Sequence, residues 1–380
     1  MSPADGTILG TTQIFGTAPR RTAFNVILLA EGFTNREQNA FDTAAQAFAE
    51  ILTSTTPITD YLEHINVFGV NVASTESGAD DPLAAGGTGD MVRTYFDATF
   101  GHLGIRRFLV CNQEIALAAA AEQVPEFTVV LVVVNSTIYG GSGGGVGTYS
   151  LHPSATEIAL HELGHTAFHL ADEYEYLRGC GIDTDRNTHP GPEPPEPNVT
   201  INSNLGTLKW RRLVASGTPI PTTRNADCMQ CDPQPSPVPP GTIGLFEGAD
   251  TYHCGAFRPE FNCRMRSLGA PFCQVCAAAI PRRIDRVPPV ISEIIAESSS
   301  GNRAIVRWRT SELADSQVEY GPTASLGFET PLDQSLRTLH AVLLTSLIPD
   351  TRYRFVIKTR DRVGNLATDT GGFYNPPKPE

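Results

Sequence analysis

The strongest constraint on the fold of this chain is an unbroken, mostly β-branched run from Phe127 to Val134. A run of this kind is typical of a strand that is buried on both faces, as in a parallel sheet covered by helices. A glycine-rich connection, residues 140–147, follows it. The segment S-A-T-E, residues 154–157, then has the spacing of a capping box, which predicts that a helix begins just after Ser154.

The region before this run alternates between strand and helix patterns. Residues 24–30 and 65–72 are predicted as strands, and a second capping-box pattern at residues 34–37 predicts a helix between them. The apolar face of that helix comprises Phe41, Ala44, Ala45, Phe48, Ile51 and Leu52. Another helix is predicted near residues 115–122. This order indicates an α/β domain with helices packed against a mixed, mainly parallel sheet.

The helix that follows Ser154 would carry the motif H-E-L-G-H, His161 to His165. Side chains four residues apart share one face of a helix, so both imidazoles can reach a single point, as zinc ligands do. Glu162 lies beside them, where a carboxylate can accept a proton from a water molecule activated by the metal. H-E-x-x-H is a short pattern that also arises by chance, and the predicted helix around it is what favours a zinc site.

A catalytic zinc ion takes three protein ligands and leaves one position for water. His169 continues the spacing of the two histidines, but on a straight helix it would lie about 12 Å from His161, too far for two bonds of about 2.0–2.1 Å to one ion. A later carboxylate can reach the metal only if the chain bends back after about Phe168. We therefore expect Asp172 as the third ligand, with Glu173 as the alternative.

The segment from His161 to Tyr174, H-E-L-G-H-T-A-F-H-L-A-D-E-Y, resembles the signature of peptidase family M64, the family of the bacterial IgA metallopeptidase. Further blocks resemble that family in the same order, and together they cover about residues 20 to 285. These blocks are residues 26–34, 74–82, 135–144, 252–259 and 263–266. The resemblance implies a zinc metallopeptidase similar to metzincins, in which a methionine turn lies beneath the zinc, and Met265 occupies the matching position.

Two positions depart from the family pattern. Members often have a glycine, which helps the helix to end, where this chain has His169. The aspartate that usually follows the first strand is Glu31 in this chain. The first difference bears directly on the turn that would bring Asp172 back to the metal.

The motif and the resemblance together predict a zinc-dependent endopeptidase, in which a water molecule activated by the metal attacks the scissile carbonyl. Glu162 would take a proton from this water and deliver it to the leaving amine. A hydrogen-bond donor to the developing oxyanion is also expected, with Tyr252 as the candidate and His253 as a weaker one; for either residue the alternative is a structural role. Peptide substrates commonly pair with an edge strand, to which residues 146–151 could belong.

Two other functions fit the same motifs. The chain could be a non-catalytic adhesin or binding protein on a peptidase scaffold. However, an intact H-E-x-x-H followed by an acidic residue argues against loss of the catalytic residues. It could also be a zinc hydrolase that acts on non-peptide amides, such as those of cell-wall material. Digestion of a peptide library, inhibited by a chelator and restored by zinc, separates the first alternative from a peptidase, and analysis of the products separates the second.

Six of the eight cysteines lie in residues 228–276, where they include two C-x-x-C pairs, at 228–231 and 273–276. The two pairs could bind a structural zinc ion through four thiolates, although the segment between them is long for such a site. They could instead form disulfides with one another or with the remaining cysteines, Cys111, Cys180, Cys254 and Cys263. Disulfides are favoured because the neighbouring proline-rich loops need bracing, but the connectivity does not follow from the sequence.

The segment V-P-P at residues 287–289 marks a boundary, which predicts a peptidase domain at 1–286 and a second domain at 287–380. Short alternating strands are expected in the second domain at residues 304–308, 316–320 and 353–358. The segment L-I-P-D-T-R-Y, ending at Tyr353, resembles the L-x-P-x-T-x-Y corner of fibronectin type III domains, with Trp308 as the buried tryptophan of an all-β sandwich. Such a module would bind a partner or a surface, or hold the enzyme away from one.

The composition limits the partners of this chain. A formal net charge of −13 argues against nucleic acid, because its binding requires a basic face. The resemblance to a peptidase family implies a protein or peptide substrate. No apolar run reaches the length of a membrane span. The N-terminal residues show no secretory signal, yet the resembling family includes exported enzymes and fibronectin type III modules favour such a setting. We therefore expect an extracellular or cell-surface protein.

Overall fold

The structure, a computed structural model, describes residues 3–298 and 302–377 of the chain. The chain divides into two compact units, Met1–Ile284 and Asp285–Glu380. Residues 1–2 and 378–380, which fall in the two expected domains, lie outside the described residues, as do 299–301. None of the described helices is both long and apolar enough to cross a membrane.

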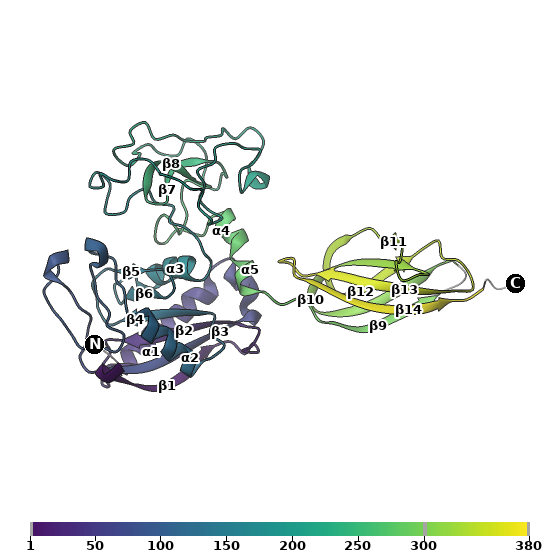
Figure 1. The fold of residues 1–380 in the computed structure, drawn as a ribbon, viewed down its shortest axis with the longest axis horizontal. Helices are drawn as coiled ribbons and strands as arrows, with labels where there is room; N and C mark the ends of the chain where they lie inside the picture. The colour runs from purple at the N-terminus through teal and green to yellow at the C-terminus, as the bar shows by residue number, and fades with distance from the viewer. Residues whose placement is uncertain (1–2, 299–301, 378–380) are drawn as a thin grey trace. The chain divides into compact units, whose positions relative to one another are not determined.

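A six-stranded sheet forms the centre of the first unit (Figure 1). Its strands are β1 (Gly6–Phe15), β2 (Phe24–Glu31), β3 (Ile65–Ser74), β4 (Val129–Val134), β5 (Gly141–Ser142) and β6 (Gly147–Ser150). They lie in the order β1-β3-β2-β4-β6-β5. The four inner strands are parallel, whereas β1 and β5 run antiparallel at the two edges. The predicted mixed, mainly parallel sheet is therefore confirmed.

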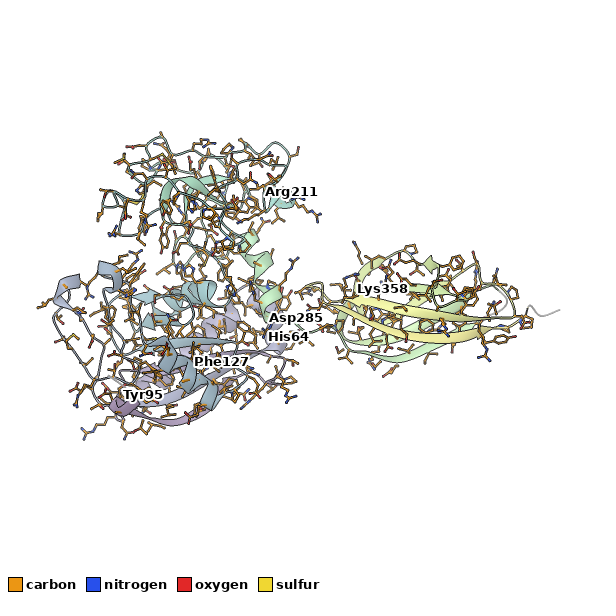
Figure 2. The ribbon with its side chains drawn as sticks, in the orientation of Figure 1. His64, Tyr95, Phe127, Arg211, Asp285 and Lys358 are labelled. Atoms are coloured by element: carbon orange, nitrogen blue, oxygen red, sulfur yellow. A yellow bond between two sulfur atoms is a disulfide. The ribbon has the colours of Figure 1, made fainter. Side chains whose placement is uncertain are left out.

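Helices of the first unit are α1 (Gln38–Ser54), α2 (Gln113–Gln123), α3 (Ala155–Thr166), α4 (Gln274–Ala279) and α5 (Pro281–Ile284). Short 3₁₀ helices occur at Pro3–Asp5, Ile58–His64, Leu83–Ala85, His102–Gly104 and Arg211–Leu213. Every residue of β2 and β4 is buried, and α1 and α2 both pack on these strands. The side chains in Figure 2 fill the space between helices and sheet.

The predicted capping box before α1 forms only in part. The backbone N–H of Thr34 donates to the Glu37 carboxylate at 2.8 Å, as in a capping box, but the helix begins only at Gln38. Four of the six apolar residues that the helical spacing predicted are buried, namely Phe41, Ala45, Phe48 and Leu52, whereas Ala44 and Ile51 are half-buried. The amphipathic pattern therefore located the helix correctly, and the start signal was displaced by one turn.

Glu31, at the end of β2, is a buried carboxylate that organises the following loops. Its Oε1 accepts hydrogen bonds from the Thr94 hydroxyl at 2.6 Å and the Ala98 N–H at 2.8 Å, and its Oε2 accepts from the Phe96 N–H at 2.9 Å. Burial raises the pKa of this carboxyl to about 7, although the hydrogen bonds oppose the shift. The glutamate thus ties the sheet to residues 94–98.

Between α3 and α4 the chain is mostly irregular, apart from the hairpin of β7 (Phe246–Ala249) and β8 (Tyr252–Arg258). Two disulfides, Cys180–Cys231 and Cys228–Cys254, brace this segment. The predicted disulfides are confirmed for these four cysteines. The alternative of one zinc ion held by both C-x-x-C pairs is wrong, because the first pair is divided between two disulfides. Cysteines that remain free are Cys111, Cys263, Cys273 and Cys276.

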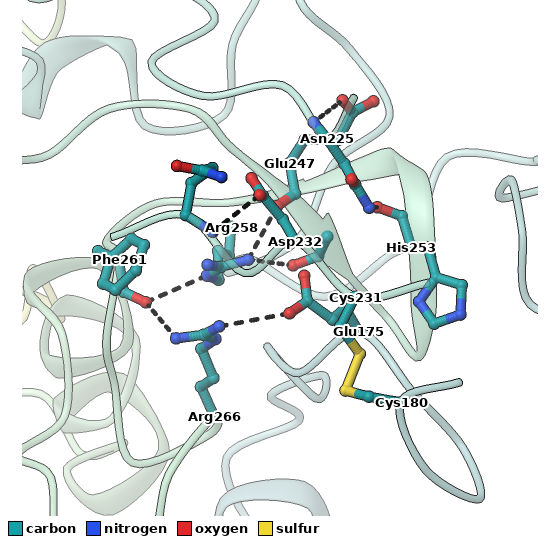
Figure 3. Close-up of polar contacts among 12 residues, drawn as sticks. Glu175, Cys180, Asn225, Cys231, Asp232, Glu247, His253, Arg258, Phe261 and Arg266 are labelled. Atoms are coloured by element: carbon teal, nitrogen blue, oxygen red, sulfur yellow. Dashed lines mark hydrogen bonds and ion pairs between the residues drawn. A yellow bond between two sulfur atoms is a disulfide. The ribbon is translucent and has the colours of Figure 1, made fainter. Parts of the chain in front are cut away.

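Two arginines hold the irregular segment together from within (Figure 3). Arg258 Nη1 donates to the Glu247 carbonyl at 3.0 Å, and Arg266 Nη2 pairs with a Glu175 carboxylate oxygen at 3.5 Å. Both guanidinium groups also donate to the Phe261 carbonyl, at 3.3 Å and 3.2 Å respectively. These hydrogen bonds and this ion pair therefore help to stabilise a segment that has little regular secondary structure.

The second unit is antiparallel throughout its strands. These are β9 (Ile291–Ser298), β10 (Ala304–Gly321), β11 (Phe328–Glu329), β12 (Asp333–Leu344), β13 (Thr351–Arg360) and β14 (Leu366–Asn375). One sheet contains β9, β12 and the first part of β10, and the other contains β11, β13, β14 and the last part of β10. Large apolar side chains from both sheets form one core, which includes Trp308, Tyr320, Leu344, Tyr353 and Phe355.

The prediction of separate strands at residues 304–308 and 316–320 was wrong, because both lie in the continuous strand β10. The register of β10 against β12 shifts between Arg309 and Ala314, and such an irregularity lets one strand pass from one sheet to the other. The predicted corner has the hydrogen bond expected of it, since the Tyr353 hydroxyl accepts from the Ile348 N–H at 2.9 Å. Trp308 is buried, as predicted.

Candidate metal centre and active-site cleft

Helix α3 begins at Ala155, immediately after Ser154 as the sequence predicted. The predicted capping box does not form, because the Ser154 side chain makes no capping hydrogen bond. Glu157 instead pairs with Arg264 and accepts a hydrogen bond from the Gly269 N–H at 3.0 Å. The acidic residue of the first turn therefore connects α3 to the loop that carries Met265.

The two histidines of α3 direct their Nε2 atoms toward one another, and these atoms lie 3.2 Å apart. The Nδ1 atom of His161 lies 3.1 Å from the Arg264 carbonyl oxygen, and that of His165 lies 2.7 Å from the Leu170 carbonyl oxygen. A carbonyl can only accept a hydrogen bond, so each Nδ1 carries a hydrogen. Each Nε2 is thereby left to present its lone pair, as metal-binding histidines do.

The chain turns back directly after α3. His169 adopts a left-handed backbone conformation with φ 51°, and the Leu170 N–H donates to the Gly164 carbonyl at 3.0 Å. This turn brings Asp172 Oδ1 to 3.1 Å from Nε2 of both His161 and His165. His169 itself is exposed and takes no part in the cluster, as expected. Of the two carboxylates considered from the sequence, Asp172 joins the histidines and Glu173 does not.

The three atoms have the spacing of ligands around one small cation. Zinc bonds of about 2.0–2.1 Å in tetrahedral geometry place neighbouring ligand atoms about 3.3–3.4 Å apart, close to the observed 3.1–3.2 Å. Burial lowers the pKa of His165, but the Asp172 carboxylate outweighs this effect and raises the pKa to about 9. A proton and a metal ion therefore compete for this imidazole, and the donor set of two imidazoles and a carboxylate fits zinc.

Replacing His169 with glycine is expected to raise the free energy of unfolding by about 0.5–1 kcal/mol. A side chain in the left-handed region costs about 1–2 kcal/mol, and the greater freedom of glycine in the unfolded chain offsets part of the gain. Urea unfolding of the full chain measures the change. His169→Ala is the matched control, because it keeps a Cβ atom in the same conformation and should give no such gain. A glycine variant less stable than the alanine variant would contradict this account of the turn.

Glu162 is buried beside the histidines, next to the edge strand of the sheet. A Cβ atom on Gly141 of β5 would lie only 2.8 Å from Glu162 Oε1 and 2.6 Å from Ile158 Cγ2. Glycine at this position therefore allows the strand to approach the carboxylate closely. Burial raises the pKa of Glu162, so its carboxylate is a stronger base than an exposed glutamate.

A cavity of about 800 Å³ opens over the three candidate ligands and Glu162. Its lining comes from α3, from strand β5 and from loops on both sides of them. Among the residues that line it are Arg107, Tyr139, Gly141, Ser142, Ile158, His161, Glu162, His165, Asp172, Tyr174, Tyr176 and Arg266. The volume is within the range of small-molecule and cofactor sites, and the converging polar groups distinguish it as the candidate active site.

Strand β5, rather than the segment predicted from the sequence, forms the edge of the sheet at this cavity. Residues 146–151 include β6, which is buried and pairs with β4 on one side and β5 on the other. The prediction that this segment forms the edge was therefore wrong. The glycine-rich connection supplies the last strand of the sheet instead, and a single parallel bridge joins its Gly141 to Phe108 on the outer side. Gly141 and Ser142 both line the cavity.

The structure does not bring Tyr252 to the candidate metal ligands. Its hydroxyl accepts a hydrogen bond from Arg186 Nη1 at 2.7 Å, its ring packs against His189 at 4.9 Å, and it lines a separate cavity of about 410 Å³. His253 is fully buried and does not line the larger cavity. Tyr252 and His253 are positioned by strand β8, which begins at Tyr252 and does not bring either side chain to the candidate metal ligands.

Two residues that the sequence analysis missed lie where Tyr252 was expected. Tyr174 lines the cavity, and its ring stacks on His161 at a centroid distance of 6.2 Å. Burial raises its pKa well above the ordinary value, and the Asp172 carboxylate raises it further, so the hydroxyl keeps its proton. Arg107 lies over the Tyr174 ring at 5.9 Å, and its buried Nη2 has no hydrogen-bond partner among the described residues.

Met265 packs beneath α3, at the position expected of a methionine turn. It is fully buried, and a Cβ atom on Gly164 would lie 2.5 Å from its Sδ. The glycine of H-E-L-G-H therefore leaves room for the thioether to pack against α3. A polarisable side chain of this kind fills irregular space closely, which suits the floor of a metal site.

Comparisons with solved structures are weak. The fn3 domain of human collagen alpha-1(XX) chain is 23% identical, with 25% of this chain and 88% of that chain covered and a TM-score of 0.19. The FN5 domain of Drosophila Lar is 17% identical, with 24% and 98% covered and a TM-score of 0.18. OgpA from Akkermansia muciniphila is 9% identical, with 96% and 95% covered and a TM-score of 0.22. Scores of this size do not establish a shared fold.

The sequence family is clear by contrast. No curated protein matches this chain. The profile of the family IgA peptidase M64, however, matches residues 13–232 and 235–284. The matched residues include strands β2 to β6 of the central sheet, helix α3 with both histidines, the turn that carries Asp172, and the loop around Met265. The candidate metal-ligating residues lie in the part of the chain that this profile matches, and the chain therefore belongs to the IgA peptidase M64 family.

Proposed function

We propose that this protein is a zinc-dependent endopeptidase. The observation that carries the proposal is the convergence of His161 Nε2, His165 Nε2 and Asp172 Oδ1 within 3.2 Å of one another, with Glu162 beside them in a cavity of about 800 Å³. Two imidazoles and one carboxylate leave a position open in a four-coordinate site, as catalytic zinc requires. Membership of a peptidase family supports the same reaction.

Glu162 is the proposed general base and acid. A zinc ion bound by these three ligands would supply Lewis-acid activation of a water molecule and of the scissile carbonyl. Glu162 takes a proton from the attacking water and transfers it to the nitrogen of the departing amine. Burial raises the pKa of this carboxyl, which makes Glu162 a stronger base than an exposed glutamate.

Tyr174 and Arg107 are the proposed donors to the carbonyl oxygen of the scissile bond, in place of Tyr252. Both line the cavity, and the Tyr174 hydroxyl keeps its proton because its pKa is raised. The unpartnered Nη2 of Arg107 is a buried donor available to an incoming acceptor. Hydrogen bonds that strengthen as negative charge develops on that oxygen lower the barrier of the reaction.

Membership of a peptidase family favours a peptide rather than a small amide as the substrate. Gly141 of β5 lines the cavity beside Glu162, but its N–H donates to the Arg107 carbonyl at 3.1 Å and its carbonyl accepts from the Leu109 N–H at 3.4 Å. A substrate would therefore lie along the cavity without adding a strand at Gly141. We propose cleavage within segments of protein substrates.

Removal and restoration of the metal tests the proposed function. The full chain is incubated with a peptide library and unfolded proteins, and cleavage products are identified by mass spectrometry. Hydrolysis within peptides is expected, with loss on treatment with a chelator and recovery on addition of zinc. Cell-wall material serves as the parallel substrate. Absence of peptide cleavage by the zinc-loaded protein would contradict the proposal, and cleavage of cell-wall amides alone would reassign the reaction.

The second unit and the disulfides support an extracellular setting for this enzyme. We propose that residues 285–380 form a fibronectin type III-like module, since the unit has two antiparallel sheets and the corner hydrogen bond of Tyr353. We further propose that the module binds a partner or surface. The two disulfides are typical of proteins that fold in an oxidising compartment.

A further inference from the structure

A second group of metal-ligating side chains lies in the first unit, apart from the three candidate catalytic ligands. It consists of Glu173, Cys263, Cys273 and Cys276, whose ligand atoms all lie within 4.8 Å of one another. All four residues are buried, and none lines the cavity of about 800 Å³. The proposed peptidase mechanism uses none of them.

We propose that Glu173, Cys263, Cys273 and Cys276 bind a structural zinc ion. Zinc–sulfur bonds of about 2.3 Å in tetrahedral geometry place two sulfur atoms about 3.8 Å apart, and a sulfur and a carboxylate oxygen about 3.5 Å apart. The Cys263 and Cys276 sulfurs lie 3.8 Å apart. Glu173 Oε1 lies 3.7 Å from the Cys273 sulfur and 3.3 Å from the Cys276 sulfur. These separations match a tetrahedral site.

A disulfide within this group accounts for the arrangement less well. A sulfur–sulfur bond is about 2.05 Å long, far shorter than the separation of 3.8 Å between Cys263 and Cys276. Three cysteines cannot all pair with one another, so any disulfide would leave a thiol and a carboxyl buried together. The chain forms disulfides at its other cysteines in this segment, Cys180–Cys231 and Cys228–Cys254. Cys263, Cys273 and Cys276 take no part in either of these disulfides.

The polar surroundings of the group also favour a cation. Glu173 is completely buried, and although its Oε1 accepts from Asn198 Nδ2 at 3.0 Å, its Oε2 has no hydrogen-bond partner among the described residues. Backbone N–H groups donate to two of the sulfurs, from Cys273 to Cys263 at 3.2 Å and from Cys276 to Cys273 at 3.4 Å. Such hydrogen bonds stabilise thiolates, and a buried carboxylate needs a compensating charge.

The location of the proposed site indicates a structural role for the zinc ion. Glu173 follows Asp172, the proposed third catalytic ligand, and its N–H donates to the Met265 carbonyl at 2.8 Å. Cys263 lies two residues before Met265. A zinc ion here would therefore fasten the returning chain after α3 to the loop beneath the histidines. Four protein ligands leave no open position, as is usual for structural zinc. The three thiols release their protons to solvent when the metal binds.

Metal and thiol counts on the full chain, purified with zinc and without reductant, test this inference independently of peptidase activity. About two zinc ions per chain are expected by elemental analysis, and about one in Asp172→Ala. After denaturation with a chelator, four thiols should react, from Cys111, Cys263, Cys273 and Cys276. Only two reactive thiols would show a disulfide within the group and overturn the proposal, as would a single zinc ion in the wild-type protein that Asp172→Ala loses.

Substitution with cobalt distinguishes the two sites by their ligands. Absorption from thiolate-to-cobalt charge transfer is expected in the wild-type protein and in Asp172→Ala, and it should be lost or strongly reduced in Cys276→Ser. Cys111→Ser is the matched control, because Cys111 is free but lies outside the group, and it should keep the absorption. Wild-type protein that binds cobalt without this absorption would overturn the proposal. If Cys276→Ser does not fold, the wild-type spectrum and thiol count still decide.

Discussion

Replacing Glu162 with glutamine is expected to lower kcat/KM for peptide hydrolysis by about 10²–10⁴-fold while the bound zinc is retained. The amide has nearly the same shape as the carboxylate and fills the same buried position beside Gly141. It cannot take a proton from water at neutral pH, so the attacking water loses its base. The ligands His161, His165 and Asp172 are unchanged, and metal content should therefore equal that of the wild type.

The measurement pairs kinetics on a fluorogenic peptide with elemental analysis of the same preparation. Glu157→Gln is the matched control, since Glu157 lies on the same helix but pairs with Arg264, and its half-exposed carboxylate does not line the cavity. This control should keep most of the activity. Full activity in zinc-loaded Glu162→Gln would remove Glu162 from the mechanism.

Replacing Asp172 with alanine is expected to remove about one zinc equivalent per chain and to abolish peptide hydrolysis at ordinary zinc concentrations. Residues that merely orient a ligand change metal affinity by about 10–100-fold, so loss of a direct ligand should exceed that range. The remaining pair, His161 and His165, cannot hold the ion with comparable affinity. Zinc affinity measured by competition with a chelator, together with activity across a zinc titration, checks both parts of this result.

His169→Ala is the control for the Asp172 variant. His169 lies in the same turn, is exposed and makes no contribution to the cluster. Its replacement should leave zinc affinity and hydrolysis close to the wild-type values. Retention of zinc by Asp172→Ala together with loss of zinc from His169→Ala would show that the ligand set is wrong.

Local patterns predicted those parts of the site that lie within one element. Residues four apart on a helix must share a face, so the pairing of His161 with His165 follows from spacing alone. Bond lengths excluded His169 and required the chain to bend back, which left Asp172 as the expected ligand and Glu173 as the alternative. The structure supplies the bend through the left-handed conformation of His169, a conformation that the sequence does not specify for a histidine.

Contacts between distant segments were less accessible from the sequence. Tyr252 matched a family block, yet its position on β8 directs it to Arg186 rather than to the histidines. Tyr174 follows the proposed metal ligand Asp172 closely in sequence, and that proximity could have identified it. Arg107 gave no such signal, because it reaches the cavity from a loop that precedes α2. The disulfide partners also depend on how irregular loops fold, which spacing does not determine.

The sheet was predictable because burial on both faces leaves a continuous apolar record, as in β2 and β4. Strand β5 has no such apolar pattern. It consists of Gly141 and Ser142 and could not be recognised by hydrophobicity. The error in the second unit, where two separate strands were predicted in place of β10, has the opposite cause. Polar residues interrupt their alternating pattern, but β10 continues through the interruption with a shift in its register against β12.

The continuity of β10 has a consequence for how the C-terminal unit comes apart. One uninterrupted backbone is the hydrogen-bonded neighbour of β9 and β12 at its beginning and of β11 and β13 at its end. If β10 detaches from one sheet, the other sheet also loses a strand. Loss of order should consequently spread through both layers in a single cooperative step, so that amide protons in the two layers exchange with a common protection.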